Sequence, residues 1–411
     1  MNAHLPQMLA GLTVLDLSLF VAGPFGSMIL ADLGAEVIKI EPLEGDPIRD
    51  NQMGVQIEGE SAQFQSYNRN KRSVCINLKS DAGRELFLNL AKTADVVYDN
   101  FRPGVMQRLG LSYDSLRAIN PGIISVSISA FGADGPLAKN PGYDLIVQAL
   151  GGGMSLTGHA QTGPAHIPFH IGDIAGGLYG AISILAAVVE RNRTGRGRAL
   201  DISLLDAQIA LLGDEVTNCA ASGVAPDQHG AGHPQLVPYR AFMTKDAPLV
   251  IAAVGVEKFW IGLTNALGQP ELANDTRFSN NKLRVANRAD LESVLEAILS
   301  KDTCEHWLDR LIECDVPAAP VLNVRDAIAH PQVVHRDAIA KARLAGGTPV
   351  AYARTPIRTT GEPAHEVIAA PRRGAHTRAV LIERVGLATK DVDQLIEAGV
   401  VRQHTLLPKE S

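Results

Sequence analysis

The sequence predicts an open, parallel α/β sheet of Rossmann type followed by a smaller α+β domain, and two observations support this. Up to about residue 212, short apolar and β-branched runs alternate with helical patterns, which is the order that builds parallel sheets. A segment dense in glycine and proline follows at residues 222–238, and beyond it a hairpin pattern gives way to helices. We expect a domain boundary in this segment.

Each element of the first part is predicted from its apolar pattern and from the residues at its ends. The first three elements form a βαβ unit with Pro24 in the first helical turn, where a missing N–H is tolerated. The expected strands are residues 11–17, 36–40, 95–98, 122–129 and 199–202, and the expected helices are 24–33, 82–93, 174–191 and 204–212.

The later elements follow from the same patterns. Asn287 is expected to cap a helix, because its side-chain oxygen can accept from free backbone N–H groups. The expected elements are a hairpin over 239–254, helices over 257–267, 289–299 and 303–312, an extended segment over 348–358, and helices over 377–385 and 390–398.

The composition is that of an ordinary globular protein. The 411 residues carry a formal net charge of −6, so no overall positive field exists to attract nucleic acid or an anionic membrane. The four cysteines fit neither a disulfide framework nor a CxxC metal site, which favours a cytoplasmic protein. No secretory signal is evident, and the most apolar helix, residues 174–189, is shorter than the ~20 residues that span a membrane.

The turn after the first strand has one feature of a dinucleotide site, because Glu41 closes the second strand about 18 residues after Gly23. The glycine pattern argues against this interpretation. The loop has no GxGxxG, and Pro24 stands where a backbone N–H would face a pyrophosphate. We therefore expect no nicotinamide cofactor and no other tightly bound one.

Residues 66–110 carry eight Lys or Arg against four Asp or Glu, in a chain that is acidic overall. A polyphosphate could bind here, because residues 70–73 and 100–104 lie in short loops, where binding groups concentrate. The alternative is a solvated charged face without a ligand, which is the more typical outcome for such a composition.

Asp173 is the clearest candidate for chemistry, because it stands where the long apolar helix begins and few other charges surround it. One interpretation is an N-cap whose carboxylate accepts from free backbone N–H groups. The other is a nucleophile, since the helix dipole favours an ionised carboxylate, and glycines at 172, 176 and 177 would let a bulky substrate approach. The two interpretations are compatible.

Three histidines, His159, His166 and His170, flank the same region. Their spacings of seven and four fall in a loop rich in glycine and proline, and no HExxH motif is near. The sequence therefore predicts no metal site.

Nine stretches of this sequence resemble the family III CoA-transferases, the group of formyl-CoA transferase and carnitine CoA-transferase, which is related to the 2-methylacyl-CoA racemases. They cover nearly the whole chain, and their order is highly specific. The stretches are VLDLSLFVAGPFGSMILADLGAEVIKIEP, NRNKRSVCINLK, YDNFRPGVMQRLGL, ISAFGADGP, PGYDLIVQALGG, IGDIAGGLYGAISILAAVVERNRTGRG, HPQLVPYRAF, HPQVVHR and GLATKDVDQLIEAGVV.

The resemblance implies an enzyme that moves CoA from an acyl-CoA to a free carboxylic acid. Asp173 would attack the thioester, forming first an aspartyl anhydride and then an aspartyl-CoA thioester. Since the reference pKa of aspartate is about 3.9, we expect Asp173 to be ionised at neutral pH without a general base. The resemblance also places Tyr143 and Asp144 beside the acyl group, and a closing loop at Gly230 and Gly232.

The same resemblance implies a binding site for CoA. Lys79 and Arg108 are the natural partners of its phosphates. Val21 replaces a glutamine of formyl-CoA transferase, which favours small dicarboxylic or branched acids over formate and oxalate. The residues implied to line CoA are Val21, Ala22, Ile76, Lys79, Asn100, Phe101, Arg108 and Leu204.

Two other functions stay open. The racemases use a histidine where this chain has Tyr143, and tyrosine, with a pKa of about 10, is a far weaker base at neutral pH. A CoA-binding protein without activity would leave Asp173 without a role. A transferase is the favoured interpretation.

The resemblance finally implies a domain layout and an assembly. A large domain would be built from both chain ends, residues 1–224 and 326–411, with a small domain at 225–325 between them. The partners would be an acyl-CoA, a small carboxylic acid and a second copy of the chain in an interlocked homodimer.

Overall fold

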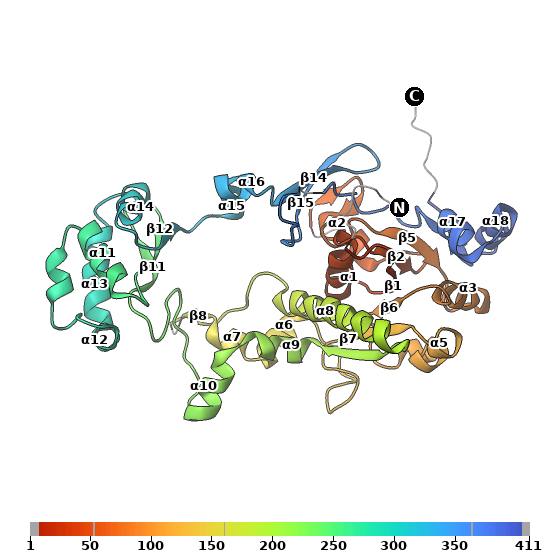
Figure 1. The fold of residues 1–411 in the computed structure, drawn as a ribbon, viewed down its shortest axis with the longest axis horizontal. Coiled ribbons are helices and arrows are strands. Elements are labelled where there is room, and N and C mark those ends of the chain that lie inside the picture. The colour runs from red at the N-terminus through yellow and green to blue at the C-terminus, as the bar shows by residue number, and fades with distance from the viewer. Residues whose placement is uncertain (1–7, 52–53, 160, 363–364, 405–411) are drawn as a thin grey trace. The chain divides into compact units, whose positions relative to one another are not determined.

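The computed structural model describes the chain in two compact units. The smaller unit extends to Val334 and also takes in Ser155–Ala165, a segment that the sequence assigned to the large domain. The described residues are 8–51, 54–159, 161–362 and 365–404 (Figure 1). The larger unit consists of the residues up to Met154, His166–Ala225, and the residues from His335 onward.

A seven-stranded sheet in the order β10-β7-β6-β1-β2-β5-β16 forms the larger unit (Figure 1). Its first six strands are parallel, and their order along the sheet is that of the Rossmann fold, 3-2-1-4-5-6. The predicted parallel α/β sheet is thus confirmed. The strands are β1 (Thr13–Asp16), β2 (Glu36–Glu41), β5 (Arg72–Ile76), β6 (Val96–Asp99), β7 (Ile124–Ser129), β10 (Ala199–Ser203) and β16 (Val401–Arg402).

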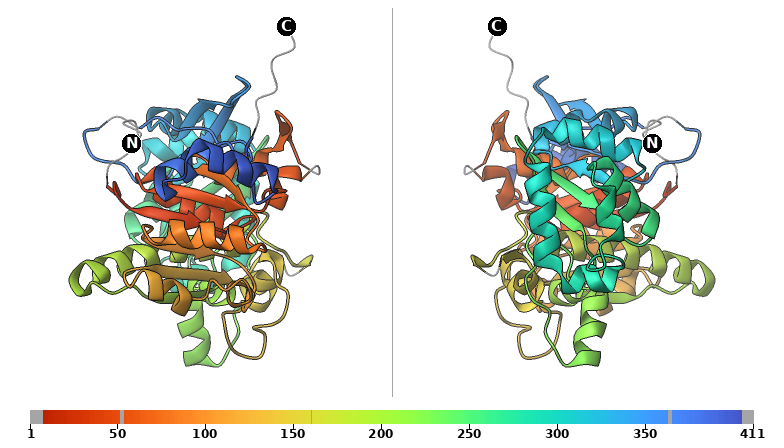
Figure 2. Two further views of the ribbon diagram at one scale, coloured as in Figure 1. Left: turned by 90° about the vertical axis from the view of Figure 1, so that its right-hand side faces the viewer. Right: turned by 90° about the vertical axis from the view of Figure 1, so that its left-hand side faces the viewer.

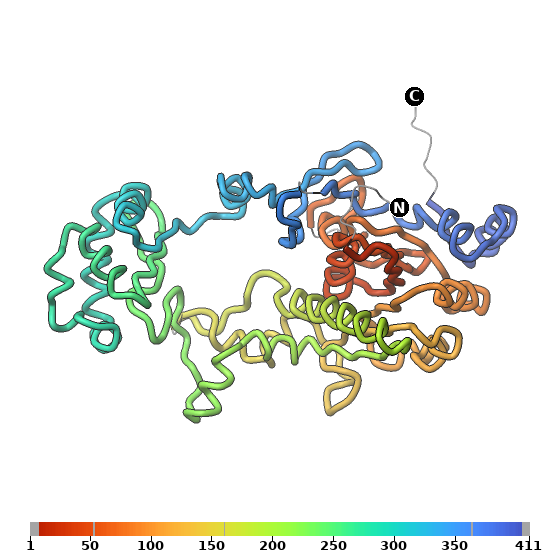
Figure 3. Tube along the Cα trace, viewed as in Figure 1, coloured from red at the N-terminus to blue at the C-terminus, as the bar shows by residue number. Residues whose placement is uncertain are grey.

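The C-terminal part of the chain closes one edge of this sheet. β16 runs antiparallel to β5, with Val401 opposite Ile76 (blue beside orange-red in Figure 3). The helical segment predicted at 377–385 is present but changes type, since α17 is followed directly by one π-helical turn, η3. The elements are α17 (Thr377–Val380), η3 (Leu381–Val385) and α18 (Thr389–Glu397).

Helices cover both faces of the sheet, because neighbouring residues of each strand point to opposite faces. Val14 and Val37 pack into one core with α1 and α8. Leu15 and Ile38 pack into the other core with α3, α5 and α18, which lie in front of the sheet in the left view of Figure 2. The helices are α1 (Ala22–Asp32), α3 (Asp81–Ala91), α5 (Tyr113–Ile119), α8 (Ile171–Thr194) and α9 (Leu204–Leu211).

The glycines of α8 let this helix pack closely against its neighbours. A Cβ atom on Gly177 would lie 2.5 Å from the carbonyl oxygen of Ala22 in α1, and one on Gly176 would lie 2.2 Å from the Leu204 side chain in α9. Both distances are far below van der Waals contact. The prediction that these two glycines open the site to a substrate is therefore corrected, since they serve helix packing.

Helix α8 is longer than predicted, with 24 residues. In the part of the chain that the structure describes, it is the one helix whose length and composition would allow it to cross a membrane. The core helix of a globular protein meets the same criteria, and α8 packs along α1 and β7. Less than half of its most apolar stretch is buried in this chain.

Shorter elements complete the larger unit. Several of them were not predicted, because a short sequence does not show the regular spacing of apolar residues that marks a helix or a strand. Helix α2 and helix α6 are the two that bear on the site. The elements are η1 (Pro47–Asp50), β3 (Gln56–Ile57), β4 (Glu60–Ser61), α2 (Ala62–Tyr67), α4 (Val105–Arg108), α6 (Asp144–Leu150), α7 (Gly153–Leu156), α10 (Asp214–Ser222), β14 (Ile339–Arg343) and β15 (Pro349–Ala353).

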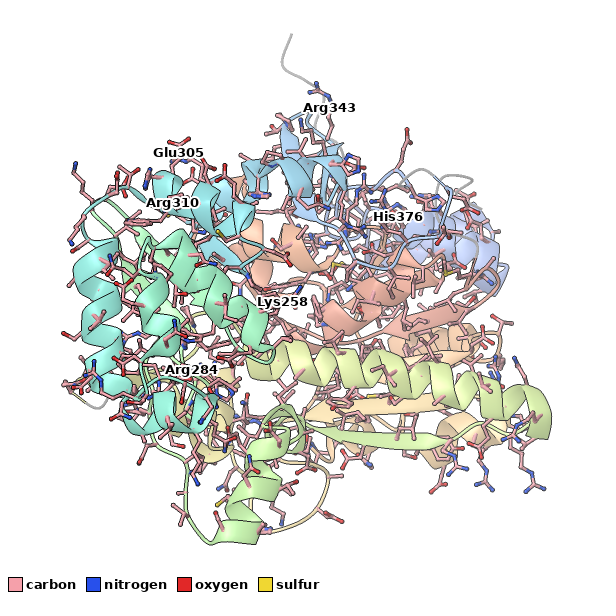
Figure 4. All side chains as sticks on the ribbon, turned by 60° about the vertical axis from the view of Figure 1, so that its left-hand side comes forward. Lys258, Arg284, Glu305, Arg310, Arg343 and His376 are labelled. Atoms are coloured by element: carbon pink, nitrogen blue, oxygen red, sulfur yellow. The ribbon has the colours of Figure 1, made fainter. Side chains whose placement is uncertain are left out.

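The smaller unit contains the predicted hairpin, joined by a third antiparallel strand, and a set of helices. Its core includes Trp260, whose ring lies 5.0 Å from the guanidinium of Arg284, labelled in Figure 4. The elements are β8 (Gly158–His159), β9 (Gly163–Pro164), β11 (Tyr239–Met243), β12 (Pro248–Ala252), α11 (Glu257–Ala266), η2 (Pro270–Asn274), α12 (Asn281–Ala286), α13 (Arg288–Leu299), α14 (Cys304–Glu313), β13 (Ala318–Pro320), α15 (Val324–Ala329) and α16 (Pro331–His335).

The predicted side-chain cap at Asn287 is wrong. Asn287 does precede α13, but its side chain makes no cap hydrogen bond there. Its Nδ2 instead donates to the carbonyl oxygens of Leu283 and Arg277. The reason is that α12 ends directly before α13, so the side chain is used to close the earlier helix.

Candidate active site

The carboxyl ends of β1 and β6 lie at the point where open α/β sheets bind ligands. The two strands are neighbours, and the helices that follow them pack on opposite faces of the sheet. The Asn100 side chain joins the two loops, accepting from Leu19 N at 2.8 Å and donating to Leu19 O at 2.7 Å. Four residues implied to line CoA, namely Val21, Ala22, Asn100 and Phe101, follow these two strands.

Buried charges hold the loop after β1 in one conformation. The Lys39 ammonium donates to the carbonyl oxygen of Ser18 at 2.7 Å and pairs with Asp46 at 3.0 Å, and both charged side chains are fully buried. Asp46 in turn accepts from the backbone N–H of Phe20, which has a φ of +63°. This conformation is unfavourable for a bulky residue, so the surrounding contacts keep Phe20 in place.

A cavity of about 570 Å³ opens beside this loop, inside the larger unit. Four residues expected near the acyl group or CoA lie in its wall: Val21, Tyr143, Asp144 and Asp173. Several further wall residues could not be predicted from the sequence, because α2, η1 and residues 166–170 come together only in the folded chain. These include Phe20, Ile48, Asn51, Gln63, Leu145 and Phe169.

Asp144 caps helix α8, and Asp173 does not. Oδ1 of Asp144 accepts from the backbone N–H of Gly172 at 2.7 Å and of Asp173 at 3.2 Å, while Oδ2 accepts from Gln148 Nε2 at 2.7 Å. A Cβ on Gly172 would meet Val147 at 2.7 Å, so this glycine allows α6 to lie against the helix start. The N-cap interpretation of Asp173 is therefore wrong.

The carboxylate of Asp173 is left without a hydrogen bond from any residue that the structure describes. Burial, together with the charge of Asp144, raises its pKa from 3.8 to about 7. Asp173 was expected to be ionised throughout the neutral range. A pKa of about 7 means that the protonated and the ionised form are both present at neutral pH, because burial and then the charge of Asp144 disfavour ionisation.

The local excess of positive charge at residues 66–110 is largely consumed by internal contacts. Arg69 pairs with Asp32, Lys71 with Asp16, Arg72 with Glu36 and Glu383, and Arg84 with Asp81. Within the described part of this segment, the basic side chains without a carboxylate partner at hydrogen-bond distance include Lys79, Arg102 and Arg108, and all three are exposed.

The remaining residues implied to line CoA lie at the same edge of the sheet but differ in what they can offer. Lys79 is in the turn after β5, and Arg108 ends α4 after β6. The side chains of Ile76 and Leu204 are buried in the two cores, at 1% and 6% exposure. Only the backbones of these two residues are therefore available to a ligand.

The predicted loop glycines lie in the smaller unit. Gly230 has a φ of +56°, and a Cβ at this position would lie 2.2 Å from the ring of His159. Gly232 forms a β-bridge with Arg240. His166 and His170 line the cavity of the larger unit, and the described residues contain no group of three His, Cys, Asp or Glu side chains that could hold a metal.

Several known proteins are similar to this chain over most of its length. The family model described as CoA-transferase family III matches residues 9–377. The chain is 40% identical to acetyl-CoA:oxalate CoA-transferase of Acetobacter aceti, over 88% of this chain and 92% of that one. It is 34% identical to succinyl-CoA:glutarate CoA-transferase of Mus musculus, over 96% and 91%. The crystal structure of a CAIB/BAIF family protein from Brucella suis matches with a TM-score of 0.81 and 38% identity, over 92% of this chain and 99% of that one.

Proposed function

The chain belongs to CoA-transferase family III and is a CoA-transferase that acts on an acyl-CoA and a carboxylic acid, and from this premise we propose that Asp173 is its covalent nucleophile. The supporting observation is a carboxylate that no described residue bonds, in the wall of a cavity beside the sheet's ligand-binding point. An unbonded, partly desolvated carboxylate is available to attack a carbonyl carbon.

The proposed reaction has four balanced steps. The Asp173 carboxylate attacks the thioester carbon, the C–S bond breaks, and CoA thiolate leaves an acyl-aspartyl anhydride. The thiolate then attacks the aspartyl carbonyl and releases the donor acid, which leaves an aspartyl-CoA thioester. The acceptor carboxylate attacks that thioester and again displaces the thiolate. Finally the thiolate attacks the acceptor's acyl carbon and frees the Asp173 carboxylate.

We propose that CoA lies along the carboxyl edge of the sheet, with its phosphates held by Lys79, Arg102 and Arg108. Strands β5 and β6, which lead to these residues, are separated by β2 and β1, so about 14 Å of sheet lies between them. An extended nucleotide with several phosphates can bridge such a distance. The exposed side chains of Lys79, Arg102 and Arg108 can bind phosphate. Arg69 and Arg72, by contrast, already pair with carboxylates.

The proposed acid is a small dicarboxylate. The cavity wall in the described residues contains no Lys or Arg, but the amide side chains of Asn51 and Gln63 and the rings of His166 and His170 can donate hydrogen bonds. A second carboxylate could be bound by these groups while the first reacts at Asp173. The relative named for glutarate acts on such a dicarboxylic acid, whereas the relative named for oxalate acts on an acid that Val21 was expected to disfavour.

The decisive experiment is substitution of Asp173 with asparagine, assayed with succinyl-CoA or acetyl-CoA as donor and a panel of mono- and dicarboxylic acids. We expect D173N to lower CoA exchange by at least about 10³-fold, since the nucleophile is lost. The control is D214N, because Asp214 is an exposed aspartate in the first turn of α10. It should leave the rate unchanged.

Two outcomes would contradict the proposal. Full exchange by D173N would remove Asp173 from the chemistry. Entry of solvent deuterium at the α-carbon of the acyl-CoA, without exchange of CoA between acids, would support the racemase alternative instead.

A further inference from the structure

The start of helix α8 offers no free backbone donor to a reacting carbonyl. The N–H groups of residues 171–174 are all bonded: the middle two donate to Asp144, and the outer two donate to the carbonyl oxygens of Phe169 and His170. Attack of a carboxylate on a thioester develops negative charge on the carbonyl oxygen, which needs a hydrogen-bond donor. The donor therefore has to lie outside this turn of α8.

Tyr67, the last residue of α2, reaches the face of α8 that carries Asp173. Its ring packs edge-on against Phe25, with ring centroids 6.1 Å apart at 82°. A ring carbon of Phe25 lies 3.1 Å from the position that a Cβ on Gly177 would take. Gly177 is four residues after Asp173, so the two share one face of the helix.

The surroundings of Tyr67 also place it beside the cavity. Its side chain packs against the small cluster that includes Val21 and Ile48, and both of these residues line the cavity wall. The hydroxyl has no hydrogen-bond partner among the residues that the structure describes. The hydroxyl is therefore available to donate to a ligand oxygen.

Tyr67 is protonated throughout the neutral range. Burial, followed by the charges of Asp173 and Asp144, raises the pKa of its hydroxyl above the ordinary value of 10.0. The side chain therefore donates a hydrogen bond and does not act as a base. The influence of both carboxylates also agrees with a position close to the reacting group.

The polar side chains that line the cavity wall itself fit this role less well. Tyr143 is 70% exposed, so water competes for its hydroxyl. The amides of Asn51 and Gln63 are the groups proposed above to bind the second carboxylate of the acid. His166 is exposed, and a histidine donor would depend on its protonation state or tautomer.

We infer that the Tyr67 hydroxyl donates a hydrogen bond to the carbonyl oxygen of the acyl group that reacts with Asp173. This rests on the proposed function. As the Asp173 oxygen bonds to the carbonyl carbon, the carbonyl π electrons move onto the oxygen, and the Tyr67 O–H stabilises the resulting oxyanion while keeping its proton. When the thiolate leaves, the carbonyl re-forms and the hydrogen bond weakens.

The test is Tyr67→Phe, which removes the hydroxyl but keeps the ring that packs against Phe25. We expect kcat to fall about 10- to 100-fold, with KM for the acyl-CoA changed less than about 3-fold, because the hydrogen bond is strongest in the transition state. The control is Tyr113→Phe in α5, which packs against the opposite core and should keep the wild-type rate.

An infrared measurement separates this role from a structural one. The thioester carbonyl band of an acyl-CoA bound to D173N, which lacks the nucleophile, should lie at higher frequency when Tyr67→Phe is added, since a hydrogen bond weakens the C=O bond. A structural role would leave the band of the folded enzyme unchanged. If the variant with Tyr67→Phe does not fold, the band in D173N is compared with that of the same acyl-CoA thioester in an apolar solvent, and equal frequencies would overturn the inference.

Different results would contradict the role of Tyr67 and the proposed function. Wild-type kcat in Y67F, with D173N inactive, would overturn the role of Tyr67 and leave the nucleophile in place. Absence of CoA exchange by the wild type with every donor and acid would overturn the proposed function itself.

Discussion

At the scale of single residues, the site depends on two carboxylates that share the start of one helix. Asp144 bonds the free N–H groups of α8, which leaves the side chain of Asp173 unbonded. Burial raises the pKa of Asp173 to about 7, and the negative charge of Asp144 adds to this rise. Asp144 therefore holds the helix turn that carries Asp173 and contributes to its raised pKa.

This raised pKa predicts how activity depends on pH. Only the ionised form of Asp173 attacks, so kcat/KM for the acyl-CoA should rise with pH through a single ionisation near 7 and level off above it. A pH–rate profile between pH 5.5 and 8.5 measures this. A flat profile would mean that Asp173 is ionised over the whole range.

The same carboxylate predicts a stability effect of opposite sign. Folded Asp173 holds a proton that the unfolded chain releases, so the folded state loses stability as pH rises from about 4 to about 7. D173N should thus be more stable than wild type at pH 8, on the order of 1–2 kcal/mol, and equal to it near pH 4. Thermal unfolding at both pH values is the measurement.

The exposed Asp214 supplies the control for this effect. D214N should show no difference in unfolding midpoint that changes with pH, because its carboxylate is solvated in both states. A D173N variant that is less stable than wild type at pH 8 would contradict the assignment of a raised pKa.

At the scale of elements, the glycines of helix α8 allow it to pack closely against its neighbours, although the sequence had suggested that they let a substrate approach. Gly177 allows α1 and α8 to approach until a Cβ would lie 2.5 Å from a backbone oxygen. Because α1 and α8 pack this closely, Asp173 lies in the same cavity wall as Phe20 and Val21 of the loop after β1. The sequence around Gly177 could not predict this packing, because it does not indicate that α1 is the helix that packs against α8.

Gly177→Ala should accordingly destabilise the fold by about 1–3 kcal/mol, although alanine is the better helix former by about 1 kcal/mol. The contact is with the backbone of α1, which cannot rotate away as a side chain can. Chemical denaturation measures the loss. The control on the same helix is Ser183→Ala, which should change stability by less than about 0.5 kcal/mol.

Elements with a clear period were predicted well, and short ones were not. β2, α3 and α13 were predicted to within two residues of their observed bounds, because β2 is rich in β-branched apolar residues and the two helices have apolar residues at helical spacing. Helix α6, with seven residues, gave no such signal, yet it carries Asp144. The capping of α8 by Asp144 could therefore not be predicted. Asp144 lies 28 residues before Gly172 and 29 before Asp173, whose N–H groups it accepts from.

At the scale of the whole molecule, local patterns predicted a parallel sheet but not the order of its strands. Val401 in the C-terminal strand β16 pairs with Ile76 in β5, more than 300 residues earlier in the chain, and no local pattern indicates this pairing. For the site, the family resemblance supplied Asp173, Tyr143 and Asp144. It could not supply Tyr67, because that residue's closeness to Asp173 depends on how α2, α1 and α8 pack together.

The exposed face of α8 leads to a proposal on assembly, in line with the homodimer that the resemblance implies. Leu178, Ile182 and Val189 are 42%, 57% and 64% exposed, and their spacing places them on one stripe of the helix. An apolar stripe of this kind on a folded protein marks an interaction surface. We propose that a second copy of the chain covers it.

Ile182→Asp should then weaken the dimer, because dissociation is the way to hydrate a charge placed inside an apolar interface. Sedimentation at micromolar concentration should show a dimer for the wild type and an increased share of monomer for I182D. Ile312 in the smaller unit is also exposed, at 61%, and I312D serves as the control that should remain dimeric. A wild-type chain that sediments as a monomer would leave the stripe without its partner and contradict the proposal.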